Sequence, residues 1–101
     1  MPSANRVQVN YDELLVLKDR FARASDTVNT MLSNITRRMD VLENTWVGRG
    51  RDTFFSEMQS DVLPAINRLI NALNQASAEI QRTSDQARQA EESAAGYFRQ
   101  G

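Results

Sequence analysis

The sequence predicts an all-α fold, an antiparallel helix-turn-helix hairpin that dimerises into a four-helix bundle. Apolar residues recur at alternating steps of three and four along most of the 101 residues, which is the spacing of a helical seam. A short central segment that holds two of the four glycines separates two such stretches. Only two prolines occur in the chain. Long helices are therefore favoured over a turn-rich β fold.

The first helix is predicted over about residues 10–46, after a flexible N-terminal arm over residues 1–9 that shows no apolar period. Asn10 is a favourable N-cap, and Glu13 follows it at the spacing of a capping box. The seam then alternates three-residue and four-residue steps without exception. Its members are Leu14, Leu17, Phe21, Ala24, Val28, Met31 and Ile35.

A bend is predicted over residues 46–51. The apolar series is interrupted by Arg38, resumes one residue late and ends at Trp46, and such a four-residue step locally unwinds a supercoil. Gly48 and Gly50 follow directly. Glycine adopts the positive φ angles that a left-handed helix cap requires, so the first helix should end here.

The second helix is predicted over about residues 52–96, followed by a C-terminal tail over residues 97–101. Asp52 suits the positive end of the new helix dipole. Pro64 lies inside the apolar pattern, where a proline costs roughly 3 kcal/mol, so we expect a kink over residues 61–63. The seam is bulky at first and later mostly alanine: Phe55, Met58, Val62, Ile66, Leu69, Leu73, Ala76, Ile80, Thr83, Ala87, Ala90, Ala94 and Tyr97.

The apolar stripe is wider than a two-position seam requires. An isolated pair of long helices cannot cover such a face, so we expect a second hairpin to pack against the first in a four-helix bundle. The residues that widen the stripe are Leu15, Ala22, Leu32, Phe54, Leu63 and Ile70.

The composition argues against several function classes. Cysteine and histidine are both absent, which removes the commonest nucleophile, general base and transition-metal ligand. We therefore expect no enzyme, no metal site and no cofactor. A net charge of −1 favours neither nucleic acid nor strong membrane binding. The sequence begins with no apolar leader and contains no long apolar run, so we expect neither a signal peptide nor a transmembrane helix.

Trp46-Val47-Gly48 lies at a predicted helical bend in the middle of about 100 residues with heptad patterns on both sides. In these features the chain resembles the WXG100 family, the ESAT-6-like proteins. The resemblance implies a hairpin that pairs with itself or with a paralogous WXG100-like chain, and that binds a secretion ATPase. It also implies leaderless export through a type VII (ESX/Ess-like) system from a cytoplasmic pool, and a role outside the cell as an adaptor or effector.

A second signature of that family lies near the C-terminus, where a tyrosine is followed four residues later by an acidic residue. Here Tyr97 is followed at that spacing by Gly101, so the acidic half is missing. A broader family pattern of apolar and acidic positions is matched by Ala87, Glu91, Ala94 and Phe98. The resemblance therefore implies an export signal on these residues that lacks one of its parts.

Two residues of the bend have different expected roles. Gly48 makes the turn, whereas Trp46 is expected to recognise a partner, with packing of the bundle end as the alternative. Two alternative functions also stay open: a membrane-active effector whose amphipathic helices insert into a bilayer, and a structural coiled-coil protein that is never exported.

Overall fold

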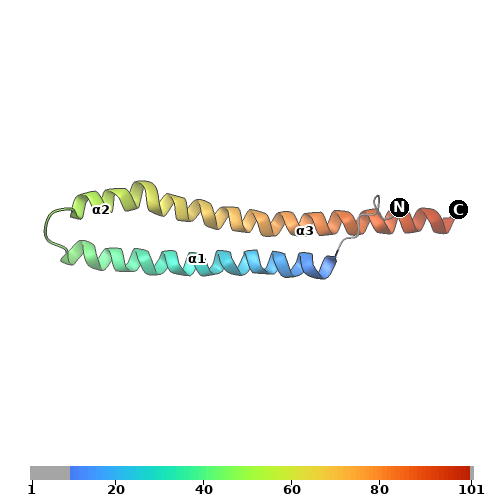
Figure 1. Cartoon of the computed structure of the whole chain (residues 1–101), viewed down its shortest axis with the longest axis horizontal. Helices are drawn as coiled ribbons and strands as arrows, with labels where there is room; N and C mark the ends of the chain where they lie inside the picture. The colour runs from blue at the N-terminus through green and yellow to red at the C-terminus, as the bar shows by residue number, and fades with distance from the viewer. Residues whose placement is uncertain (1–9, 101) are drawn as a thin grey trace, which may run out of the picture.

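The computed structural model describes the backbone of residues 10–100 and the side chains of residues 10–96. The elements are α1 (Tyr11–Thr45), α2 (Arg51–Glu57), the π-helical segment η2 (Met58–Val62) and α3 (Leu63–Gln100). Every element of this described part is helical, and α1 runs antiparallel to the continuous path from α2 to α3 (Figure 1). The all-α hairpin predicted from the sequence is confirmed. The expected N-terminal arm lies outside the described residues.

Helix α1 begins and ends at residues whose local chemistry favours a helix end. The side chain of Asn10 accepts a hydrogen bond of 3.1 Å from the backbone N–H of Glu13, as an N-cap does. Asp12 and Glu13 place negative charge in the first turn, at the positive end of the helix dipole. At the other end, the Trp46 N–H donates to the Leu42 carbonyl over 2.7 Å before the chain turns extended.

The irregularity expected near Pro64 takes the form of a π-helical turn over Met58–Val62. There the Leu63 N–H donates to the carbonyl of Met58, five residues earlier. Pro64 has no N–H to offer the carbonyl of Ser60, and its ring would collide with that carbonyl in a straight α-helix. A widened turn accommodates the ring, because π turns relax the α-helical spacing.

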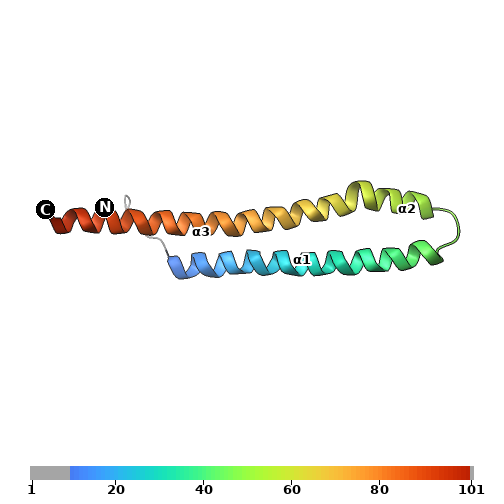
Figure 2. The same cartoon turned by 180° about the vertical axis from the view of Figure 1, so that it is seen from behind.

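Helix α3 continues to Gln100 and extends well past the start of α1 (Figures 1 and 2). The sequence predicted an end near residue 96, where Gly96 interrupts the alanine-rich stretch. One glycine inside a helix costs only about 1 kcal/mol, which is too little to end it. The last part of α3 therefore projects beyond the body of the hairpin.

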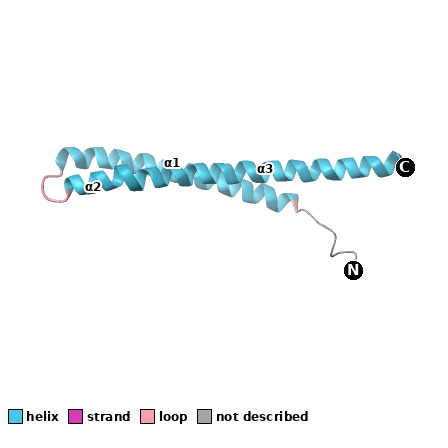
Figure 3. Ribbon diagram, turned by 90° about the horizontal axis from the view of Figure 1, so that it is seen from above, coloured by secondary structure: helices cyan, strands magenta, loops and turns pink. Residues whose placement is uncertain are grey.

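The two long helices approach each other through small side chains. Ser25 of α1 and Ser84 of α3 are the most deeply buried polar residues, at 3% and 1% exposed. The Ser77 hydroxyl donates to the Lys18 carbonyl over 3.2 Å, and the Lys18 ammonium donates to the Gln81 side chain over 2.8 Å. Seen from above, α1 and α3 cross at a shallow angle (Figure 3).

The hairpin has very little core of its own. Among the described side chains, Met39 and Phe55 are the buried hydrophobic residues. The molecule measures 79 × 23 × 17 Å, with a radius of gyration of 22.7 Å, against about 13 Å for a compact domain of this length. Large apolar side chains on both helices, such as Leu17, Met31 and Leu69, therefore stay exposed.

Candidate functional site

The bend is built on two glycines with positive φ. Gly48 has φ 135° and Gly50 has φ 88°, a region that side chains with a Cβ rarely adopt. Trp46 is the last residue before the turn and has extended backbone angles, with φ −79° and ψ 118°. Gly50 is the N-cap of α2. Gly48 has the positive φ predicted for it, but the left-handed cap predicted for the end of the first helix is wrong, because the C-cap of α1 is Trp46 in an extended conformation.

Three aromatic rings pack together beneath the bend. The ring centroid of Trp46 lies 5.3 Å from that of Phe54 and 6.0 Å from that of Phe55. The two phenylalanines meet edge to face at 5.2 Å, the geometry that aromatic pairs prefer. Phe55 is buried, whereas Trp46 is half-buried and neighbouring Val47 is 93% exposed. The bend thus combines three packed aromatic rings with an exposed apolar side chain, that of Val47.

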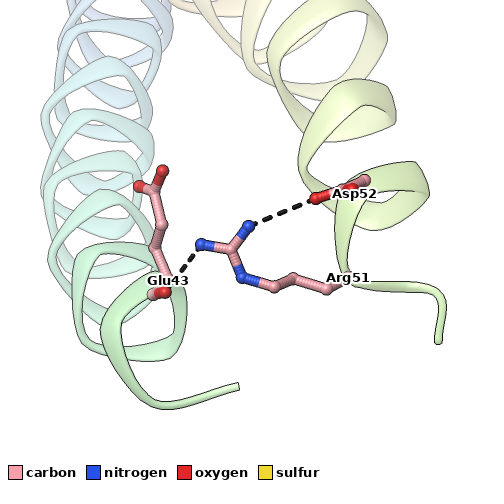
Figure 4. Close-up of polar contacts among 3 residues, drawn as sticks. All are labelled: Glu43, Arg51 and Asp52. Atoms are coloured by element: carbon pink, nitrogen blue, oxygen red, sulfur yellow. Dashed lines mark hydrogen bonds and ion pairs between the residues drawn. The ribbon is translucent and has the colours of Figure 1, made fainter. Parts of the chain in front are cut away.

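Arg51 ties the two sides of the bend together (Figure 4). Its Nη2 donates to the Glu43 carbonyl over 2.7 Å, and its Nη1 lies 3.2 Å from a carboxylate oxygen of Asp52. The same guanidinium lies 5.3 Å from the centroid of the Phe55 ring, within cation–π distance. The Arg51 side chain therefore contacts the end of α1, the start of α2 and the ring of Phe55.

The C-terminal pattern lies at the other end of the hairpin from Trp46 (Figure 1). Ala87 is half-buried, and Glu91 and Ala94 are exposed on α3. The side chains of Tyr97 and Phe98 lie outside the described residues, as does Gly101. Within one chain, the structure therefore does not bring the bend and the C-terminal pattern together.

Tyr11 and α3 meet at the open end of the hairpin, opposite the bend. The guanidinium of Arg88 lies 4.9 Å from the centroid of the Tyr11 ring. The Tyr11 hydroxyl oxygen is buried and has no hydrogen-bond partner among the described residues. Burial of this group, and next the adjacent carboxylate of Glu91, raise the pKa of Tyr11 above its ordinary value. Tyr11 is the first residue of α1, and beyond this contact α3 extends past the start of α1 (Figure 1).

The described residues hold no group of three or more acidic side chains placed to bind a metal ion. No described helix is long and apolar enough to cross a membrane. What the arrangement does offer is contact surface: an aromatic bend, a projecting helix end and exposed apolar side chains along both helices.

Sequence reasoning missed the partners of Trp46. Phe54 was assigned only to the apolar stripe, and Arg51 only to the end of the predicted bend. Two adjacent aromatic residues directly after a glycine bend are the signal that could have indicated packing beneath the tryptophan. Tyr11 was overlooked because it lies off the main seam, and only the antiparallel register places it beside Arg88.

Comparison with known proteins gives one match. The model of the WXG100 family, described as proteins of 100 residues with WXG, matches residues 6–92. That span includes all of α1, the bend and most of α3. Neither the curated proteins nor the solved structures contain a match to the chain.

Proposed function

The chain belongs to the WXG100 family, and we propose that it acts by protein–protein binding as an adaptor or effector exported through a type VII secretion system. WXG100 proteins are ESAT-6-like, non-enzymatic substrates of that system. The observation that carries the proposal is the match of this family over both helices and the Trp-x-Gly bend between them.

Trp46 is proposed to contact a binding partner at the bend. Part of its indole packs on Phe54 and Phe55, which fixes the ring in place. The rest stays accessible beside the exposed side chain of Val47. A rigid, partly exposed aromatic ring is the type of side chain that contributes most to protein interfaces. Packing and recognition are therefore compatible roles for one residue.

The body of the hairpin is proposed to pair with a second copy, with a paralogous WXG100-like chain as the alternative. The chain exposes 8139 Å², against about 5,800 Å² for a compact monomer of this mass. The excess reflects the thin, extended shape, which leaves apolar side chains of the helices uncovered. Large apolar side chains on α1, η2 and α3 contribute to it, among them Leu17, Met31, Leu42, Val62 and Leu69.

The end of α3 is proposed to carry the export signal that the secretion ATPase binds. Glu91 and Ala94 are exposed on α3; Glu91 lies next to Tyr11, the first residue of α1, and Ala94 follows it toward the projecting end of α3. The acidic residue expected four positions after Tyr97 is replaced by Gly101. A partner that supplies the missing carboxylate would complete the signal.

Export is tested in a strain with an intact type VII system and a matched strain that lacks the export ATPase. The protein is expected in the medium of the first strain and only in the cells of the second. Glu91→Gln should reduce export, and Glu79→Gln, on an exposed turn of the same helix, serves as its control. Equal extracellular amounts in both strains would contradict the proposal and favour a coiled-coil protein without an export route.

A further inference from the structure

Two neighbouring rows of α1 differ in how deeply they are buried against α3. Residues seven apart lie on the same side of a helix, because seven residues make almost two turns. In one row Ser25 is 3% exposed and Met39 8%, whereas Met31 in the next row is 54% exposed. We name the first the facing row and the second the outer row. The facing row is Lys18, Ser25, Leu32 and Met39, and the outer row is Leu17, Ala24, Met31 and Arg38.

In the first half of α1, the facing row is the more polar of the two. It contains Lys18 and Ser25 at the places where the outer row contains leucine and alanine. Burial of apolar surface alone would favour the opposite arrangement, because polar groups lose contacts with water when they are buried. In the second half the facing row is the apolar one, since Met39 is the neighbour of Arg38. A further interaction is therefore needed to keep the first half of α1 aligned with the second.

Hydrogen bonds between Lys18 and α3 supply that interaction. The Ser77 hydroxyl donates to the Lys18 backbone carbonyl over 3.2 Å. The Lys18 ammonium donates to the side-chain oxygen of Gln81 over 2.8 Å. The amide nitrogen of Gln81 donates in turn to the Asp85 carboxylate over 3.0 Å, which orients the amide so that its oxygen points at the ammonium. Both the backbone and the side chain of Lys18 are thus bonded to α3.

These bonds depend on how α1 is rotated about its own axis. The outer row differs from the facing row by one residue, which corresponds to a rotation of about 100°. Such a rotation would carry both bonded groups of Lys18 away from Ser77 and Gln81. Ser84, which follows Ser77 by seven residues, is only 1% exposed, and small side chains at a contact let two helices approach closely. The same side of α3 therefore offers both the hydrogen bonds and the close approach.

We propose that Lys18, bonded to Ser77 and Gln81, fixes the rotation of α1 about its own axis and so keeps Met31 on the outside of the hairpin. A single polar residue in an apolar helical seam specifies one arrangement in this way, at some cost in stability. The rotation itself is a property of one hairpin. Its consequence, that the outer row stays available to a second chain, rests on the proposed function. Lys18 is thus a positioning residue for pairing.

Thiol labelling of the full-length Ser25→Cys variant tests the rotation, because the chain contains no other cysteine. Ser25 is buried within its own hairpin, so this thiol should react slowly with an aqueous thiol reagent. Ser77→Ala combined with Gln81→Leu removes both partners of Lys18 and leaves its ammonium unpaired at the helix contact. The first half of α1 should then rotate to return the ammonium to water. Labelling of the Ser25→Cys thiol should rise by about tenfold or more, since thiol reactivity follows exposure.

Two further variants separate rotation from a general loosening of the hairpin. Lys18→Met, added to the Ser77→Ala and Gln81→Leu changes, should restore slow labelling of Ser25→Cys, because methionine does not need water or a hydrogen-bond partner. Met39→Cys is the matched control in the second half of the facing row, and its labelling should stay slow throughout. Unchanged labelling of Ser25→Cys, an equal rise at both thiols, or a rise that Lys18→Met does not reverse would each overturn the proposal.

Sedimentation of the same proteins distinguishes this inference from the proposed homodimer. With the outer row turned inward, the Ser77→Ala and Gln81→Leu protein should dimerise more weakly than the wild-type protein. Equal dimerisation of the two proteins would overturn the role of Lys18 in pairing. A wild-type chain that sediments as a monomer would instead refute the homodimer, while the labelling of Ser25→Cys would still report the rotation of α1.

Discussion

The Arg51 guanidinium donates a hydrogen bond of 2.7 Å to the backbone carbonyl of Glu43, eight residues earlier in the chain. The last turn of α1 contains no basic residue, although the exposed carbonyls there carry partial negative charge. Arg51 supplies that positive charge from the start of the next helix. Arg51 thus stabilises the bend by donating, from the start of α2, a hydrogen bond to a carbonyl at the end of α1.

Arg51→Ala should lower the free energy of unfolding by about 1 to 2 kcal/mol, because it removes a charge-assisted hydrogen bond and a cation–π contact. Urea unfolding at one fixed protein concentration measures the change. Arg49→Ala is the matched control, since Arg49 is exposed in the same bend, and it should change stability by less than about 0.5 kcal/mol. Equal losses for both variants would show that charge at the bend, and not the bond to Glu43, is what matters.

Gly48→Ala should destabilise the hairpin by about 1 to 2 kcal/mol, because its φ of 135° is strained for any residue with a Cβ. Gly96→Ala provides the opposite case. Gly96 is helical, and an added Cβ there would meet no atom within 4 Å, so this variant should be stabilised by about 0.5 to 1 kcal/mol. Thermal unfolding of the two variants checks the contrast in sign. A stabilised Gly48→Ala protein would mean that the turn relaxes to another conformation.

Trp46→Ala should cost roughly 2 kcal/mol, less than a fully buried tryptophan, since its ring is only half-buried against Phe54 and Phe55. Trp46→Phe should retain most of the stability, because an aromatic ring still packs there. Trp46 is the only tryptophan, so its fluorescence in the wild-type protein reports the opening of the bend. If Trp46→Phe folds normally but is not exported, Trp46 has a role in partner recognition that is distinct from its packing.

Tyr11 should make stability fall in alkaline solution. Its pKa is raised in the folded protein, first by burial and then by Glu91, so the folded state holds this proton more tightly than the unfolded state. The stabilisation that Tyr11 contributes to the folded state is present below the ordinary tyrosine pKa of about 10. It is lost as the pH rises through and above that value. Melting temperatures from about pH 9 to 11 should therefore fall more steeply for the wild-type protein than for Tyr11→Phe. Parallel curves would contradict this assignment.

The sequence predicts the features of this fold that depend on local chemistry. The Asn10 cap and the positive φ of Gly48 follow from the properties of single residues, and both are confirmed. An irregularity before Pro64 was also predictable, but its π-helical form was not. Proline removes the α-helical hydrogen bond to the Ser60 carbonyl, but a kink, a break or a widened turn can each accommodate that loss.

Periodicity did not reveal which seam residues face α3. Leu17 and Met31 belong to the regular seam, yet they are exposed, whereas Ser25 and Met39 are buried. A heptad pattern places residues on one side of a helix but does not identify the neighbour that each row contacts. Likewise, the bond from Arg51 to Glu43 joins two elements across the bend. It depends on the three-dimensional path of the turn, which spacing alone does not define.

Sedimentation equilibrium of the intact chain tests most directly the claim that this thin hairpin is one half of a larger bundle. The chain mass is 11.4 kDa, and the account predicts a species of twice that mass at micromolar concentration, with dissociation only on dilution or unfolding. A stable, folded species at 11.4 kDa over the whole concentration range would contradict it, because the exposed apolar rows would then need no partner.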